Sequence, residues 1–106
     1  MTVIRKRPEV STADFRRFME LEYGPTYVAL PQVKEYVQYY LTDLATDGAE
    51  ESIDAIVQIG FESEQEMHEA LATEEYQKAH ELRTAYIQDT SVGIHSAMLD
   101  RRVQLV

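Results

Sequence analysis

The stretch that decides the fold is RKRPEVSTADFRRFMELEYGPTYVALPQVKEYVQ, residues 5–38. Residues 2–7 overlap the start of this stretch. Their side chains alternate between two faces, as in a β-strand. Pro8 ends this segment because proline cannot donate a hydrogen bond to a neighbouring strand. We therefore predict a first strand over residues 2–7.

A helix is expected to follow this strand. Ser11 is a good N-cap for it. The next apolar side chains have the i, i+3, i+4 spacing of a helix face and are Phe15, Phe18 and Met19. The helix should cover residues 12–22. We expect Gly24-Pro25 to end it, because the residue before a proline is pushed out of the α region.

Two further strands should form a hairpin. Residues 33–42 are rich in Val and Tyr and contain no breaker, which favours a long second strand. Residues 53–61 place alternate apolar side chains on one face and Ile56 on the other, which is typical of a third strand. The acidic segment between them contains the turn signal Asp47-Gly48 and is predicted to be a loop.

A second helical region and a last strand complete the chain. Ser63 and Glu66 have the spacing of a capping box, and Thr73 can cap a continuation of the helix. This region is expected to end near Asp89. Residues 92–106 alternate loosely and predict a fourth strand whose tail reaches a partner subunit.

The predicted order of elements is βαββαβ, which indicates an α+β fold of the ferredoxin-like kind. In this arrangement a four-stranded antiparallel sheet carries both helices on one face. The third strand has apolar residues on both of its faces. Since an uncovered apolar sheet face promotes aggregation, we expect a second copy of the chain to cover it.

Length and composition limit the possible functions. The 106 residues suit a single domain, residues 1–106. A net charge of −9 argues against a nucleic-acid partner, because such binding depends on basic residues set against phosphates. No apolar segment approaches the about 20 residues of a membrane span and no leader is recognisable, so neither a membrane partner nor export is expected and the cytoplasm is the default location. The chain has no cysteine and hence no disulfide or thiolate ligand.

The ordered set of motifs resembles the EthD family. The resemblance rests on Pro8 after a basic strand, Ser11, Phe15, Arg16, Pro25, Leu30-Pro31, Tyr36-Val37-Gln38, residues 53–57, Phe61-Glu62-Ser63, Glu74-Glu75-Tyr76 and Asp89. Proteins of this family belong to the dimeric α+β barrel group. The resemblance therefore implies that this chain forms a homodimeric barrel.

The resemblance also implies a small-molecule enzyme that needs no cofactor. Relatives of this fold carry out isomerisations, cyclisations, decarboxylations and cofactor-free oxygenations, in secondary metabolism or aromatic degradation, although a fold alone does not fix an activity. The implied substrate is an aromatic, lactone or polyketide-like metabolite. Two positions that often hold histidine in the family are Tyr23 and Tyr40 here. A tyrosine, with a pKa of about 10, donates a hydrogen bond more readily than it accepts a proton.

Candidate catalytic residues follow from this comparison. Tyr23 and Tyr40 are expected to polarise a substrate oxygen, while His95 or Asp89 moves the proton. Tyr36 shares a strand face with Tyr40 and is expected to bind or orient the substrate ring. Further substrate-binding positions are Phe18, Met19 and Met98. The alternative for each of these aromatic and methionine side chains is a plain structural role in the core.

Other functions stay open at this stage. The loss of both histidines favours a non-catalytic dimer that binds a hydrophobic metabolite or supports a neighbouring oxygenase, and a structural dimer with a closed core is a third possibility. No metal site is expected, because Glu64 and His68 provide at most two ligands. We find neither a serine nucleophile elbow nor a phosphate-binding glycine loop. His68 and His80 are predicted to lie on the surface.

Overall fold

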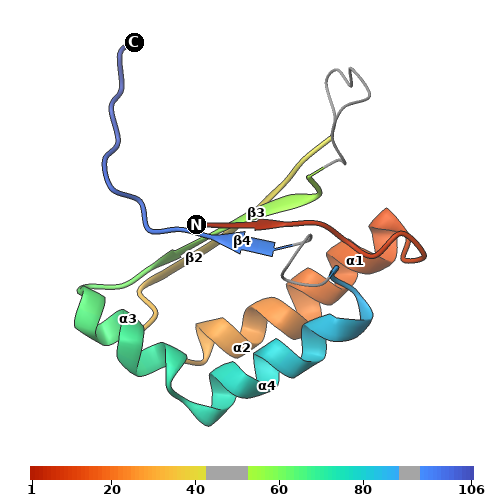
Figure 1. Ribbon diagram of the computed structural model, residues 1–106, viewed down its shortest axis with the longest axis horizontal. Helices are drawn as coiled ribbons and strands as arrows, with labels where there is room; N and C mark the ends of the chain where they lie inside the picture. The colour runs from red at the N-terminus through yellow and green to blue at the C-terminus, as the bar shows by residue number, and fades with distance from the viewer. Residues whose placement is uncertain (43–52, 89–93) are drawn as a thin grey trace.

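The computed structural model describes residues 1–42, 53–88 and 94–106. In chain order its elements are β1 (Thr2–Ile4), α1 (Thr12–Phe18), the π-helix η1 (Met19–Tyr23), α2 (Gly24–Val28), β2 (Glu35–Tyr40), β3 (Ala55–Gly60), α3 (Glu64–Leu71), α4 (Glu74–Leu82), the 3-10 helix η2 (Arg83–Ala85) and β4 (Ile94–Ser96). Figure 1 shows two layers, with the strands on one side and the helices on the other. The α+β class predicted from the sequence is confirmed.

The strands form one antiparallel sheet in the order β2-β3-β1-β4. β2 and β3 pair along their whole length, which confirms the predicted hairpin. β1 lies between β3 and β4, so the first and last strands of the chain are neighbours. Val3 is opposite Ile56 on one side and His95 on the other.

The first helical region is longer than predicted, and the prediction that Gly24-Pro25 ends it is wrong. α1, η1 and α2 follow one another without a break from Thr12 to Val28. At the junction, the Gly24 N–H donates to the Met19 carbonyl, five residues back, as in a π-helix. This wider turn shifts the hydrogen-bond register, and Pro25 falls in the first turn of α2, where a missing N–H is tolerated.

Gly24 lies where strand β2 passes close to this helix. A Cβ atom at Gly24 would lie 2.8 Å from Gln38 Nε2 and 2.8 Å from the Met19 carbonyl oxygen. Gln38 Nε2 itself donates to the Met19 carbonyl at 2.8 Å and to the Tyr36 hydroxyl at 3.1 Å. The contact between β2 and the first helical region therefore depends on a glycine and a side-chain amide.

The helix starts carry the side-chain caps that the sequence indicates. In each case the hydroxyl accepts a hydrogen bond from the backbone N–H three residues later, at 3.1, 3.1 and 3.2 Å for Ser11, Ser63 and Thr73.

The longest of these helices, α4, has nine residues. Within the described residues, no helix combines the length and the apolar character needed to cross a bilayer. The cytoplasmic location stays a prediction.

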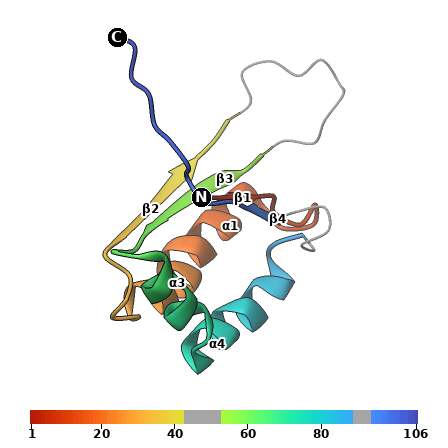
Figure 2. The same ribbon diagram turned by 60° about the vertical axis from the view of Figure 1, so that its left-hand side comes forward.

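The strands are shorter than predicted, most of all at the C-terminus. The fourth strand does not extend over residues 92–106, because β4 ends at Ser96 and residues 97–106 have no regular structure. The last backbone hydrogen bond after β4 runs from the Ala97 N–H to the Met1 carbonyl at 2.9 Å, next to the start of β1 at Thr2. The segment after Ala97 runs away from the two layers (Figures 1 and 2). The Asp47-Gly48 turn and the helix end expected at Asp89 lie outside the described residues.

The core fills the space between the sheet and the helices. Its largest fully buried side chains are Phe15, Phe18, Ile4, Met19, Ile87 and Val57. Phe18 stacks on Tyr86, with ring centroids 4.1 Å apart. Burial of such side chains is the main favourable contribution to folding, at roughly 1.5–3 kcal/mol for each large apolar side chain.

The other face of the sheet has no covering layer among the described residues. Val3, Ile56 and Tyr39 lie opposite one another on β1, β3 and β2. The Tyr39 side chain is 45% exposed. Figure 2 shows all the helices on the opposite side of the sheet. This row of apolar side chains is the outer-face row referred to below.

The close approach at Gly24 predicts the effect of Gly24→Ala. In an ordinary helix this change stabilises by roughly 0.5–1 kcal/mol. Here the added methyl group meets a backbone oxygen, and overpacking of this kind costs about 1–3 kcal/mol. We expect the free energy of unfolding, measured with urea, to fall. A Gln38→Ala background, which removes one of the two crowding groups, should reduce the loss caused by Gly24→Ala; a gain in stability in the wild-type background would contradict the close approach.

Candidate functional site

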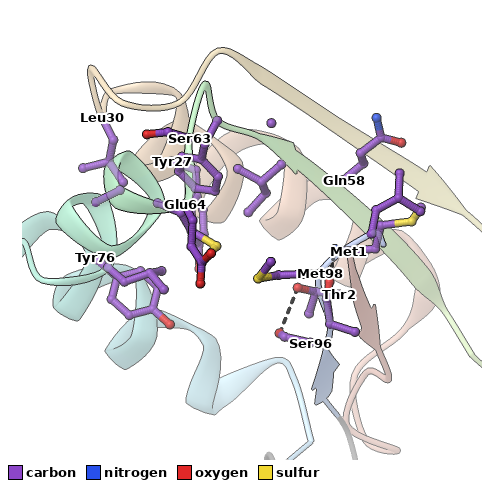
Figure 3. Close-up of a pocket in the computed structure, with 18 of the residues that line it drawn as sticks. Met1, Thr2, Tyr27, Leu30, Gln58, Ser63, Glu64, Tyr76, Ser96 and Met98 are labelled. Carbon is purple, nitrogen blue, oxygen red and sulfur yellow. Dashed lines mark hydrogen bonds between the residues drawn. The ribbon is translucent and has the colours of Figure 1, made fainter. Parts of the chain in front are cut away.

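A cavity of about 530 Å³ opens between the sheet and the helical layer. Its walls come from β1, the end of β3, the end of β4 with the residues after it, and the helices η1, α2, α3, α4 and η2. Figure 3 shows Tyr27 and Tyr76 on one side of it and Thr2, Ser96 and Met98 on the other. The size suits a small organic molecule, since ligand pockets commonly measure about 300–1,000 Å³.

Two tyrosines from the first helical region form a hydrogen-bonded pair in the cavity wall. Tyr23 ends η1 and Tyr27 lies one turn later in α2, so their side chains share a helix face. Their hydroxyl oxygens are 2.9 Å apart. The side chains are only 4% and 6% exposed, and their rings meet edge to face with centroids 5.2 Å apart. The pair therefore presents polar atoms in a largely apolar wall.

Both phenols of this pair stay protonated at neutral pH. Burial raises the pKa of Tyr23; the hydrogen bond with Tyr27 and the nearby Arg83 lower it without cancelling that effect. Burial also raises the pKa of Tyr27, and the neighbouring Tyr23 raises it further. The pair has two hydroxyl protons, and one of them lies in the hydrogen bond that joins the two hydroxyl oxygens. Among the described residues no other acceptor lies within hydrogen-bond distance, so one phenolic proton is free for a ligand.

Arg83 brings a positive charge to the same cavity. It begins η2, directly after α4, and it lines the cavity together with Tyr23. Its Nη2 lies 2.5 Å from His80 Nε2, and the guanidinium can only donate, so this imidazole nitrogen is the acceptor. Burial and the charge of Arg83 lower the pKa of His80. The ring of His80 also meets the Tyr76 ring edge to face at 5.8 Å.

Among the described residues that line the cavity, Glu64 carries the one carboxylate side chain. It is the first residue of α3, after the Ser63 cap. Its side chain is 66% exposed, and its Oε1 lies 3.6 Å from His68 Nε2. Glu64 therefore lies at the open side of the cavity, where solvent screens its charge.

Of the four predicted catalytic residues, the structure places Tyr23 at the cavity and Tyr40 elsewhere. Tyr40 lies at the far end of β2, where its hydroxyl donates to Gln38 Oε1 at 2.5 Å and its ring lies under the Arg16 guanidinium at 5.2 Å. Burial raises the pKa of Tyr40 to about 12. The backbone of His95 pairs with Val3 in β4, but its side chain lies outside the described part of the chain. Asp89 also lies outside the described residues.

The predicted substrate-binding residues are divided between the cavity and the core. Met98 lines the cavity. Tyr36 stacks on the back of Tyr27, with ring centroids 5.7 Å apart, and lines a second, more open hollow beside α2. Phe18 and Met19 are 1% and 0% exposed and belong to the core rather than to the described wall of the cavity.

Three residues of the cavity were missed by sequence reasoning. Tyr27 carries a signal, since it follows Tyr23 by four residues and so shares its helix face. Tyr76 entered the sequence analysis only within the Glu74-Glu75-Tyr76 motif of the family resemblance, and Arg83 follows it by seven residues on the same helical region. Arg83 alone has no local signal, because only the fold brings it to Tyr23.

The described residues contain no cluster of three or more His, Cys, Asp or Glu side chains able to hold a metal ion. Apart from Glu64 at the open side, the polar groups of the described cavity wall are phenols, a guanidinium, amides and hydroxyls. Their chemistry is hydrogen bonding to a ligand oxygen, in surroundings that burial keeps largely apolar.

Fold and site together define a small α+β protein with a ligand-sized cavity between an antiparallel sheet and its helices. A family model described as the EthD domain matches residues 7–84. This match covers most of the chain, and the protein therefore belongs to the EthD family, within the dimeric α+β barrel superfamily. The resemblance seen in the sequence is confirmed. A comparison with curated protein sequences gave no significant match.

The contact between Arg83 and His80 predicts a low pKa for His80. In an NMR titration His80 should titrate below its ordinary value of 6.5, and Arg83→Gln should raise its pKa because the neighbouring charge is removed. Since the pKa of His80 is lower in the folded state, the stability that its neutral ring contributes is present above pH 6.5 and is lost as the pH falls through the lowered value. An unchanged His80 pKa in Arg83→Gln would contradict the contact.

Proposed function

We propose that the protein is a cofactor-independent small-molecule enzyme, of the isomerase, cyclase, lyase or cofactor-free oxygenase type. Its substrate is an aromatic, lactone or polyketide-like metabolite held in the cavity beside Tyr23 and Tyr27. The observation that carries the proposal is the buried hydroxyl pair, with one phenolic proton left for a ligand. Membership of the EthD family is compatible with this activity but does not specify it.

In this proposal the tyrosine pair acts on a carbonyl or phenolic oxygen of the substrate. A donor fixed in apolar surroundings stabilises negative charge that develops on such an oxygen, and it does so without reorganisation. Tyr36 supports Tyr27 from behind through ring stacking. Met98 offers an unbranched, adaptable side chain to the rest of the substrate.

The proton has to be moved by another group, because the raised pKa values of both phenols make them poor bases. His95 and Asp89 remain the candidates proposed from the sequence. Glu64 is the carboxylate at the open side of the cavity and joins them as a candidate.

The alternative function is a non-catalytic dimer that binds a hydrophobic metabolite or supports a neighbouring oxygenase. A specific observation favours it. Tyr23 and Tyr40 stand where relatives often have histidine, and burial raises the pKa of both. A cavity whose described wall offers buried phenol donors can hold a ligand without transforming it.

For either function we propose a ferredoxin-like subunit that pairs with a second copy into an α+β barrel. The strand order β2-β3-β1-β4, with every described helix on one face, supports this arrangement. The outer-face row of Val3, Ile56 and Tyr39 needs an apolar cover. The exposed apolar side chains of the C-terminal segment, such as Leu105, suit contact with the partner.

Tyrosine-to-phenylalanine variants test the catalytic proposal. Tyr23→Phe should lower turnover of the natural ligand, identified by native mass spectrometry of protein purified from its host, by about 10²-fold, the usual effect of losing a fixed donor to a developing oxyanion. Tyr86→Phe is the matched control, because the Tyr86 ring stacks on Phe18 and the residue does not line the cavity. Unchanged turnover in Tyr23→Phe would remove this residue from the mechanism, while ligand binding without any turnover would favour the alternative function.

The dimer is tested by placing a charge in the outer-face row. Ile56→Glu should convert the wild-type dimer to a monomer, because a carboxylate buried without a partner is strongly unfavourable. Leu21→Glu is the control, since Leu21 is 68% exposed in the helical layer. Size-exclusion chromatography with light scattering gives the subunit count. A wild-type monomer at micromolar concentration would contradict the barrel.

A further inference from the structure

The charge of Arg83 has no carboxylate partner among the described residues. Ion pairs in this part of the chain join Arg7 to Glu9, Arg17 to Asp14 and His68 to Glu64. Arg83 instead contacts the neutral acceptor His80, and it lies near enough to Tyr23 to influence the pKa of that phenol. In a protein with a net charge of −9, Arg83 is therefore a half-buried cation beside the cavity that no carboxylate of the described residues neutralises.

Several hydrogen-bond donors remain available on this side of the cavity. A guanidinium has five N–H donors in a fixed plane, and one of the two Nη atoms of Arg83 is held by His80. The Tyr23–Tyr27 pair adds one free phenolic proton. Planar N–H donors next to a hydroxyl donor match the geometry of a carboxylate or another oxyanion.

Glu64 does not cancel this charge. Its side chain is 66% exposed at the open side of the cavity and interacts with His68 on its own helix. Arg83 and the tyrosine pair lie on the helices that form the other walls. A ligand group placed beside Arg83 therefore meets positive charge and donors, while the carboxylate of Glu64 remains in contact with water.

We propose that the ligand of this cavity is an anion, with a carboxylate or enolate-type oxygen on its aromatic or polyketide-like skeleton, and that Arg83 selects it through its guanidinium. This inference rests on the proposed function, because it assigns the charge of the ligand held beside Tyr23. His80 is a positioning residue in this arrangement, since it touches Arg83 and orients the guanidinium. A neutral ligand of the same shape would leave the guanidinium without an anionic partner in the occupied cavity.

Two fluorescent probes that share a naphthylamine skeleton test the inference on the full chain. 8-Anilinonaphthalene-1-sulfonate is an anion, and N-phenyl-1-naphthylamine is its neutral counterpart. We expect the wild-type protein to bind the anion more tightly, and Arg83→Met to weaken binding of the anion by about tenfold or more, in line with the strength of charge-assisted hydrogen bonds. Affinity for the neutral probe should change by less than about twofold, because this probe loses no charge-assisted hydrogen bond when Arg83 is replaced.

The controls separate the charge of Arg83 from other effects. Arg83→Lys keeps the charge and should retain part of the preference for the anion. Arg17→Met removes an exposed arginine that faces Asp14, and it should change neither affinity. Circular dichroism and thermal unfolding establish that each variant is folded.

The outcomes distinguish this inference from the proposed function. If the neutral probe binds, and Arg83→Met leaves the affinity for the anion unchanged, Arg83 does not select the ligand and the inference is overturned while the cavity remains a ligand site. If neither probe binds to folded wild-type protein, the cavity does not accept aromatic ligands, and the inference and the proposed function both fail.

Discussion

The site depends on the contact between β2 and the π-helical turn. Gln38 reaches the Met19 carbonyl because Gly24 has no Cβ atom in the way. The π turn lets the helix pass through Pro25 and continue to Val28. Without this continuation, Tyr27 would not lie one helical turn after Tyr23, and their hydroxyl groups would not be held together by helix geometry. A packing constraint between a strand and a helix thus creates the polar part of the cavity.

Buried phenols give this cavity a preference that does not depend on catalysis. A hydroxyl that is removed from water and lacks a partner costs roughly 1–3 kcal/mol. The Tyr23–Tyr27 hydrogen bond satisfies one proton of the pair and leaves the other to be satisfied from within the cavity. A ligand with a well-placed oxygen is therefore favoured over a hydrocarbon of the same shape. Because both pKa values are raised, this preference should hold across the physiological pH range.

Local sequence patterns predicted the elements but not how they meet. The caps at Ser11, Ser63 and Thr73 were predictable because each hydroxyl and the N–H that it binds lie within four consecutive residues. The π turn was not, since it is stabilised by Gln38 on a distant strand. Alternation correctly placed Tyr36 and Tyr40 on one face of β2, and in the structure both pack against the core on that face. Four residues of strand span about 13 Å, so a shared face does not bring both side chains to one cavity.

The same distinction explains which cavity residues were found. Tyr23 and Met98 were proposed from residue type and family resemblance, and both line the cavity. Arg83 was not proposed, because neither its neighbours in the chain nor its spacing signals a ligand site. Its relation to Tyr23 exists only once the end of α4 has packed beside α2. Residues that meet through tertiary packing are visible only in the folded structure.

The aromatic composition gives the protein a convenient optical property. The chain contains seven tyrosines and no tryptophan, so its intrinsic fluorescence comes from phenol rings alone. Tyr23, Tyr27 and Tyr76 line the cavity, and Tyr36 stacks behind Tyr27. Emission from a phenol is sensitive to the hydrogen bonding of its hydroxyl and to nearby rings. A large share of the ultraviolet signal of this protein therefore originates at the cavity, and occupancy of the cavity can be followed without an attached label.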